Sequence, residues 1–260
     1  MTGVQTCALP IYWELGYPDK ARRCADASVE LARAVGHRFT LAYALTYAGA
    51  DFSYFMRDAS RALTFAREGE EVTKKGGFLY LHTVCSFHHA WSLGRLGSPA
   101  EALDGMRRAL DQIRQFGVIA IMAPRLTAQL AEACGHAGKP DEGLEVLASS
   151  PDRAPGRTRI RYSDISRIEG DLHLAKGKPD PALAESCYLE AIAIAIMDKA
   201  KIPQLRASLR LAQLWLTQGK ASQARELLRP VYHSFTEGHE TTDLIKVQQL
   251  LGELEPERSL

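Results

Sequence analysis

A glycine-containing turn recurs along the chain at a spacing of about 40 residues. The clearest copies lie 41, 39 and 42 residues apart, at Gly97, Gly138, Gly177 and Gly219. Gly16 lies 81 residues before Gly97, and Met56–Ala62 fills the gap between them as a degenerate copy. Glycine suits the left-handed C-cap of one helix, and the proline or small residue that follows suits the first turn of the next. The spacing therefore predicts an array of helix–turn–helix repeats, the first of them incomplete.

Between the turns, apolar residues recur with the 3.6-residue period of amphipathic helices, and no stretch alternates like a strand. The expected helices are Pro18–Val35, Arg38–Phe55, Asp58–Lys75, Phe78–Leu96, Ser98–Phe116, Val118–Ala137, Lys139–Ala148, Arg159–Ala175, Pro181–Asp198, Ile202–Gln218, Ala221–Ser234 and a final helix over 241–254. One such pair cannot bury its apolar face alone and must stack on its neighbours. The prediction is an all-α fold, a right-handed superhelical array of antiparallel helix pairs with about six repeats.

These units resemble tetratricopeptide repeats, an α-solenoid family. Their Trp-Leu-Gly pattern occurs loosely at Trp13–Gly16 and Trp91–Gly94. The repeats here are longer, about 40 residues against about 34. The resemblance implies a tetratricopeptide-like array with elongated helices.

The chain divides into segments of different character. Residues 1–11 resemble the in-frame translation of a common sequencing-library adapter, so native sequence is expected to begin near Tyr12. Pro, Gly and Ser concentrate in one linker-like stretch. The predicted organisation is a leader (1–11), repeats one to four (12–148), a loop (149–158), repeats five and six (159–234) and a C-terminal capping helix (235–254), with Thr241, Thr242 and Asp243 at its N-cap.

Composition excludes several classes of protein. The net charge is +1, which provides no global field for nucleic acid or an anionic membrane. The longest apolar runs are far shorter than the roughly 20 residues of a membrane span. Five scattered cysteines without a Cys-x-x-Cys pair suit a reducing compartment, so a cytoplasmic location is expected.

An arginine cluster is one candidate contact site. Arg153, Arg157, Arg159, Arg161 and Arg167 lie on and after the predicted loop. They suit a phosphate, an acidic peptide or nucleic acid. The alternative is a solvated loop whose arginines pair with acids nearby, at Asp164, Glu169 and Asp171. Because no aromatic platform is interleaved with the arginines, nucleic acid is the less favoured partner.

Histidine and cysteine offer a second candidate. His82, Cys85 and His89 share one face of a predicted helix that also carries His88, an arrangement that zinc could use. A mixed helix surface around a buried thiol explains the same residues, and no fourth ligand is evident. Cys134 and His136 diverge at i and i+2, and no catalytic or nucleotide-binding motif occurs. We therefore expect no catalytic residue, metal or cofactor.

The early repeats are rich in aromatic residues. Tyr43, Tyr47 and Tyr54 are candidates to line the concave groove and hold a peptide or a neighbouring domain. Packing in the core and between repeats is the alternative explanation.

The end of the chain resembles one family closely. Its motif reads Leu-Leu-x-Pro-Val-Tyr-x-x-Phe-Thr-Glu-Gly-x-x-Thr-x-Asp-Leu and is matched by Leu227, Leu228, Pro230, Val231, Tyr232, Phe235, Thr236, Glu237, Gly238, Thr241, Asp243 and Leu244. The family is the C-terminal tetratricopeptide-like region of large bacterial signalling ATPases of the STAND/AAA type. In these, a class III adenylate/guanylate cyclase or a LuxR-type DNA-binding domain precedes the ATPase.

That resemblance implies a non-catalytic interaction or sensory region that regulates an upstream effector domain. Its partner would be that domain in cis, or a separate peptide or protein. The alternative is a free-standing helical enzyme or small-ligand binder that uses the concave groove. Because a truncated first repeat leaves an apolar face exposed, self-association or fraying is expected near residues 12–35.

Overall fold

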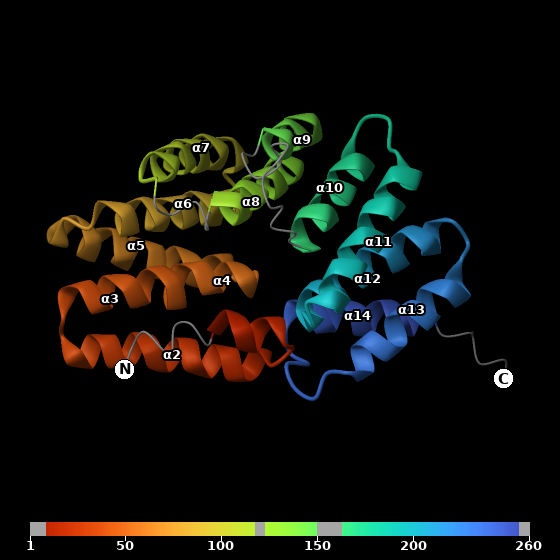
Figure 1. The fold of residues 1–260 in the computed structure, drawn as a ribbon, viewed down its shortest axis with the longest axis horizontal. Coiled ribbons are helices and arrows are strands. Elements are labelled where there is room, and N and C mark those ends of the chain that lie inside the picture. The colour runs from red at the N-terminus through yellow and green to blue at the C-terminus, as the bar shows by residue number, and fades with distance from the viewer. Residues whose placement is uncertain (1–8, 118–122, 150–162, 255–260) are drawn as a thin grey trace. The chain divides into compact units, whose positions relative to one another are not determined.

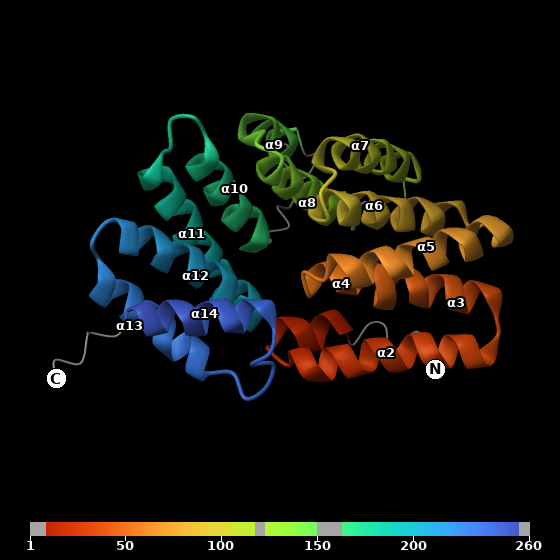
Figure 2. The same ribbon diagram turned by 180° about the vertical axis from the view of Figure 1, so that it is seen from behind.

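The computed structural model describes residues 9–117, 123–149 and 163–254. Every regular element in these ranges is helical, and none of them contains a strand (Figure 1, Figure 2). Antiparallel helix pairs follow one another along the chain, so the predicted all-α array of helix pairs is confirmed. None of the described helices is long and apolar enough to cross a bilayer.

The helices group into two compact units. Among the described residues, 9–12, 20–117 and 123–149 belong to the first unit, and 13–19 and 163–254 belong to the second. The sequence predicted one run of repeats from 12 to 148. The structure groups Trp13–Asp19 with the second unit, where this short segment contacts Arg206 and Gly238. The predicted division into repeats stays a prediction.

The first unit consists of helix pairs that stack through their apolar faces. Its elements are α2 (Pro18–Val35, of which the first two residues belong to the second unit), α3 (Arg38–Ala44), η1 (Leu45–Asp51), α4 (Phe52–Phe55), α5 (Ala59–Gly76), α6 (Leu79–Arg95), α7 (Pro99–Gln115), α8 (Ala123–His136) and α9 (Pro140–Ala148). Helix α5 packs on η1 and α6, α6 on α7, and α8 on both α7 and α9. The observed bounds follow the predicted ones closely outside residues 118–122.

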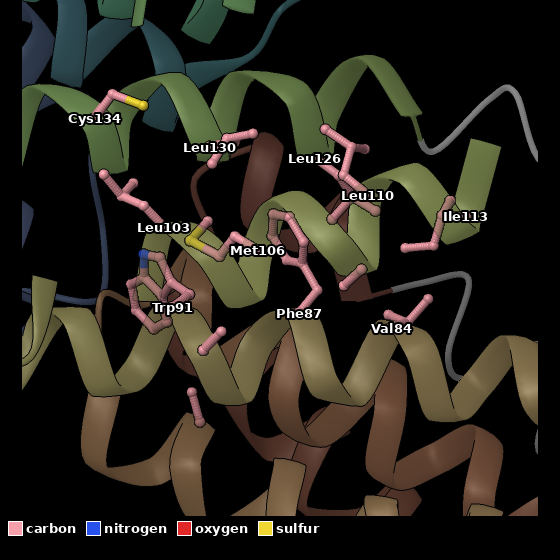
Figure 3. Close-up of a cluster of buried hydrophobic side chains, with 13 residues drawn as sticks. Val84, Phe87, Trp91, Leu103, Met106, Leu110, Ile113, Leu126, Leu130 and Cys134 are labelled. Atoms are coloured by element: carbon pink, nitrogen blue, oxygen red, sulfur yellow. The ribbon is translucent and has the colours of Figure 1, made fainter. Parts of the chain in front are cut away.

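The largest buried cluster of the first unit joins α6, α7 and α8. Figure 3 shows Phe87 and Trp91 of α6 facing Met106 of α7, with Leu126 and Leu130 of α8 on the other side. All of these side chains are 5% exposed or less. Burial of each large side chain contributes about 1.5–3 kcal/mol, so this cluster fixes the position of α6 and α8 for the site described below.

The predicted turn chemistry holds at most of the repeat junctions. Gly16, Gly97, Gly138 and Gly219 all have positive φ. In the degenerate copy, Arg57 takes the glycine position with φ 59°. Gly177 is not among the positive-φ residues, so the C-cap prediction is wrong there. That junction is longer, and Asp180 ends it by accepting a hydrogen bond from the Leu183 N–H at 3.0 Å.

Helices α3, η1 and α4 form one continuous helical rod whose centre is a π-helix. The sequence predicted an uninterrupted α-helix over Arg38–Phe55. A π-helix spaces its hydrogen bonds one residue wider and often marks a functional position. Here it ends at Asp51, which is 4% exposed.

The second unit contains α10 (Ser163–Ala175), α11 (Pro181–Met197), α12 (Lys201–Thr217), α13 (Ala221–His233) and α14 (Thr242–Glu253). Alanines let α11 and α12 approach closely, and their shared core contains Ala184, Ala191, Ala207 and Leu211. Thr241 is the N-cap of α14, as predicted, but its side chain caps no amide. Its hydroxyl donates instead to the Gly238 carbonyl, and the Asp243 carboxylate pairs with Arg206.

Candidate functional site

The first helices of three successive repeats bring polar side chains together in the first unit. These helices are the α3–η1–α4 rod, α6 and α8. Arg125 and Glu132 lie seven residues apart on α8 and therefore on one face of it. Both contact the α3–η1–α4 rod, although a whole repeat separates them from it in sequence. The face formed by these helices thus combines residues from alternate repeats.

Asp51 is the centre of this polar network. Its Oδ2 accepts a hydrogen bond from Arg125 Nη2 at 2.8 Å. Its Oδ1 lies 3.1 Å from Nε2 of His88, which is fully buried, though the ring is not aligned for a hydrogen bond. Burial by itself raises the pKa of Asp51, but Arg125 and His88 outweigh it and hold that pKa below its ordinary value. Asp51 is therefore a buried carboxylate that stays ionised because a cation from another repeat faces it.

Tyr54 and Glu132 extend the network by one helical turn. The Tyr54 hydroxyl donates to Glu132 Oε2 at 3.0 Å, and Arg57 lies 3.7 Å from the other oxygen. The Tyr54 ring packs edge-on against Trp91, with centroids 5.0 Å apart. Tyr54 therefore connects the charged network to the hydrophobic core of α6.

Six aromatic side chains form a second feature of this face, which we call the aromatic ladder: Phe78, Phe39, Tyr43, Tyr47, Tyr80 and Phe116. Neighbouring ring centroids from Phe78 to Tyr47 lie 5.1, 6.3 and 4.6 Å apart. The Tyr47 hydroxyl then donates to that of Tyr80 at 3.2 Å, and Tyr80 packs edge-on against Phe116 at 5.7 Å. Burial raises the pKa of both hydroxyls, so each keeps its proton at neutral pH.

The ladder and the network include the three tyrosines that the sequence singled out. Tyr43 and Tyr47 lie in the ladder and Tyr54 in the network, each partly exposed. Each of these side chains thus packs against its neighbours and also remains partly accessible to solvent. Their contact with a partner stays a prediction.

The histidines and cysteine of α6 do not share one centre. His82 Nδ1 lies 3.1 Å from the Thr73 hydroxyl, His89 Nδ1 lies 2.8 Å from Glu70 Oε2, and Cys85 Sγ lies 3.2 Å from the Thr46 hydroxyl. Burial raises the pKa of Cys85 to about 12, so its thiol keeps its proton at neutral pH. No group of His, Cys, Asp or Glu within the described residues has the arrangement of a metal site.

The predicted arginine cluster falls mostly outside the described residues. Arg153, Arg157, Arg159 and Arg161 all lie in the stretch that the structure leaves undescribed. Arg167 is described and is 3% exposed. It donates to Asp164 at 2.9 Å and to Asp171 at 2.8 Å, so it cannot belong to an exposed basic stripe.

In the second unit, Trp13, Arg206 and Asp243 form a buried contact, which we call the clasp. Trp13 is 2% exposed, and the Arg206 guanidinium lies 5.6 Å from its ring centroid. Arg206 is buried as well and contacts Asp243 Oδ2 at 2.7 and 2.8 Å. Burial lowers the pKa of this guanidinium, but Asp243 more than offsets the effect and raises it. A buried aromatic residue thus covers a buried ion pair.

The loop after α13 completes the clasp. The Gly238 N–H donates to Asp19 Oδ2 at 2.9 Å. Gly238 has φ +80°, and a Cβ there would lie 2.0 Å from Pro18 Cγ. The Phe-Thr-Glu-Gly-x-x-Thr-x-Asp-Leu stretch therefore has a structural role: its glycine lies against Pro18 and Asp19, the first two residues of α2.

Two segments of the chain match the tetratricopeptide repeat family model, residues 124–149 and residues 205–230. The first covers α8 and α9 and the second most of α12 and α13, so one matched repeat lies in each unit. A search of the curated proteins found no match. These two segments are similar to tetratricopeptide repeats, which commonly mediate protein–protein interaction and form an all-helical fold of a typically non-catalytic type.

Proposed function

We propose that this chain is the non-catalytic interaction and sensory region of a bacterial signal-transduction ATPase. In this proposal it acts in the cytoplasm and regulates an upstream effector, either a class III adenylate/guanylate cyclase or a DNA-binding transcription regulator. Its partner is that effector module in cis, or a peptide or protein whose binding releases the module.

The observation that carries the proposal is the face formed by α3–η1–α4, α6 and α8. There, side chains from alternate repeats contact each other directly, as Asp51 and Arg125 do. A ligand that changes the stacking of one repeat must therefore disturb contacts two repeats away. Such coupling suits a sensor whose repeats move between two arrangements. The resemblance of residues 227–244 to the closing motif of the signalling ATPases supports the choice of parent protein.

The alternative, a helical enzyme or small-ligand binder, predicts titratable groups gathered in a pocket that a substrate can enter. Asp51 and His88 lie close together, but both are buried, and Asp51 also contacts Arg125. Asp51 is already paired with Arg125, which suits a structural network better than a reaction centre.

The test begins with the gene sequence upstream of Tyr12, read from a fresh library. If it encodes a P-loop ATPase with a cyclase or DNA-binding domain, the parent protein should be made with and without residues 12–254. The proposal expects ATPase or effector activity to change on deletion, because the repeats restrain or activate the module. A start codon directly before Tyr12, or a parent whose activity ignores the deletion, contradicts it.

Self-association through the first repeat stays part of this proposal. Leu31 and Val35 of α2 are 39% and 57% exposed. Sedimentation velocity of the chain over a concentration series tests it, with Val35→Asp expected to abolish any dimer. A chain that is monomeric at all concentrations, with firm amide protection in 12–35, contradicts self-association.

A further inference from the structure

The aromatic ladder is a surface whose rings are already held in place by one another. None of its six residues belongs to the polar network around Asp51. Phe39 is 47% exposed, and the other five rings are partly exposed. Each ring is held by at least one aromatic neighbour, so little side-chain entropy remains to be lost on binding. Rigid, partly exposed aromatic side chains are typical of binding hot spots.

The ladder also offers a hydrogen-bond donor. Tyr80 accepts from Tyr47, and its own O–H donates to no other described residue. Because burial raises the pKa of Tyr80, that proton is present at neutral pH. A partly exposed phenol among rings suits a backbone carbonyl of an extended peptide, whose carbonyls have no partner within the peptide itself.

Positively charged residues lie near the end of the ladder formed by Phe39 and Phe78. Arg38 is adjacent to Phe39, and Lys74 and Lys75 lie in the last turn of α5 just before Phe78. All three are exposed, and none forms an ion pair with a described residue. The exposed acid closest to them along α5 is Glu71. This end therefore favours an anionic segment.

We infer that the aromatic ladder binds an acidic, proline-rich peptide segment in the polyproline II conformation, with carboxylates at Arg38, Lys74 and Lys75. Neighbouring rings lie 4.6 to 6.3 Å apart, so a chain that rises about 3.1 Å per residue meets a new ring roughly every second residue. Aromatic-lined surfaces bind such segments because the extended conformation is already formed before binding. This inference rests on the proposed interaction role and names the class of partner.

The experiment uses the whole chain and three fluorescein-labelled peptides of equal length. The first combines proline, leucine and glutamate, the second replaces glutamate by lysine, and the third replaces proline by alanine. Fluorescence anisotropy should show binding of the first alone, weakened by added salt because the contact is partly ionic. Phe39→Ala and Lys74→Glu should each weaken binding about tenfold or more.

Matched controls separate local loss from unfolding. Tyr17→Ala removes a comparably exposed aromatic outside the ladder, and Arg95→Glu reverses an exposed charge on α6 away from its start. Both should bind the acidic proline peptide like the unchanged chain, and circular dichroism should show equal helix content in all variants. The inference is overturned if the lysine or alanine peptide binds as well, if no peptide binds, or if Phe39→Ala has no effect.

Self-association through the ladder is a further contrary outcome. It would appear as a dimer in sedimentation that Phe39→Ala abolishes. The failure of this inference differs from that of the proposed function. Peptide binding without any effect of residues 12–254 on the parent's activity would refute only the function. Regulation of the parent without peptide binding would refute only the ladder's assignment.

Discussion

Asp51 and Arg125 are 74 residues apart in the chain, and their side chains meet at 2.8 Å inside the first unit. Asp51 ends the π-helix, and Arg125 lies at the start of α8. The ion pair spans a complete repeat, α6–α7, to which both flanking repeats are also packed. The formation of this ion pair therefore depends directly on how the repeats are stacked.

Replacing Arg125 by Met should destabilise the first unit. The change leaves Asp51 buried without its cation, a loss that costs about 3–5 kcal/mol for a fully buried pair and less here because Arg125 is 21% exposed. Arg114→Met is the matched control, because its partner Asp111 is 68% exposed and such pairs contribute about 0–1 kcal/mol. Urea unfolding followed by circular dichroism measures both. Equal effects of the two substitutions would show that the Asp51 pair contributes no more than a surface pair.

The same pair predicts a dependence on pH. The pKa of Asp51 is held below its ordinary 3.8 in the folded chain. A lowered folded-state pKa contributes stability above the unfolded value, and that stability is lost as the pH falls through the folded value. Asp51→Asn should therefore destabilise the chain at pH 7, and the difference from the unchanged chain should shrink below pH 3.8. A difference that stays constant across this range would mean that folding leaves the pKa of Asp51 unchanged.

Cys85 should resist alkylation in the folded chain. Its thiol is buried and its pKa is raised to about 12, so the thiolate that reacts with iodoacetamide is scarce at pH 8. Cys24 is partly exposed and serves as the internal comparison. Peptide mass spectrometry should find Cys24 modified first and Cys85 only after denaturant is added. Early modification of Cys85 would contradict the packing of α6 against η1.

The helix bounds could be predicted from the sequence because the residues of each repeat turn specify locally where one helix ends and the next begins. Positive φ at the repeat glycines ends one helix, and the following residues begin the next, so the helix bounds needed no knowledge of packing. The π-helix had no such local signal, because its wider hydrogen bonding depends on the surrounding packing. One hint was available: Asp51 is an acid inside the apolar stretch Ala48–Phe52.

The candidate site was predicted only in part, for a related reason. Tyr43, Tyr47 and Tyr54 were identified because aromatic residues stand out in a sequence. Arg125 and Glu132 were not, because a charged residue in a helix is ordinarily exposed. Their importance arises from the stacking of repeats, which brings α8 to the α3–η1–α4 rod. The clasp was missed similarly, because the hydrogen bond from Gly238 to Asp19 joins residues 219 positions apart.

The clasp gives the sharpest matched comparison, between Gly238→Ala and Gly219→Ala. Both glycines have positive φ, +80° and +75°, so alanine carries a similar backbone penalty of about 1 kcal/mol at each. A Cβ at Gly219 meets nothing within 4 Å, whereas one at Gly238 would lie 2.0 Å from Pro18 Cγ. Overpacking of this kind costs about 1–3 kcal/mol more. Gly238→Ala should therefore lower the thermal midpoint further than Gly219→Ala does. It should also speed hydrogen exchange in residues 13–19, because Asp19 loses its contact with the Gly238 amide.

Equal midpoints, or an exchange rate in residues 13–19 that the substitution does not change, would show that this segment is not held by the loop after α13. In that case the closing motif would need another explanation for its glycine.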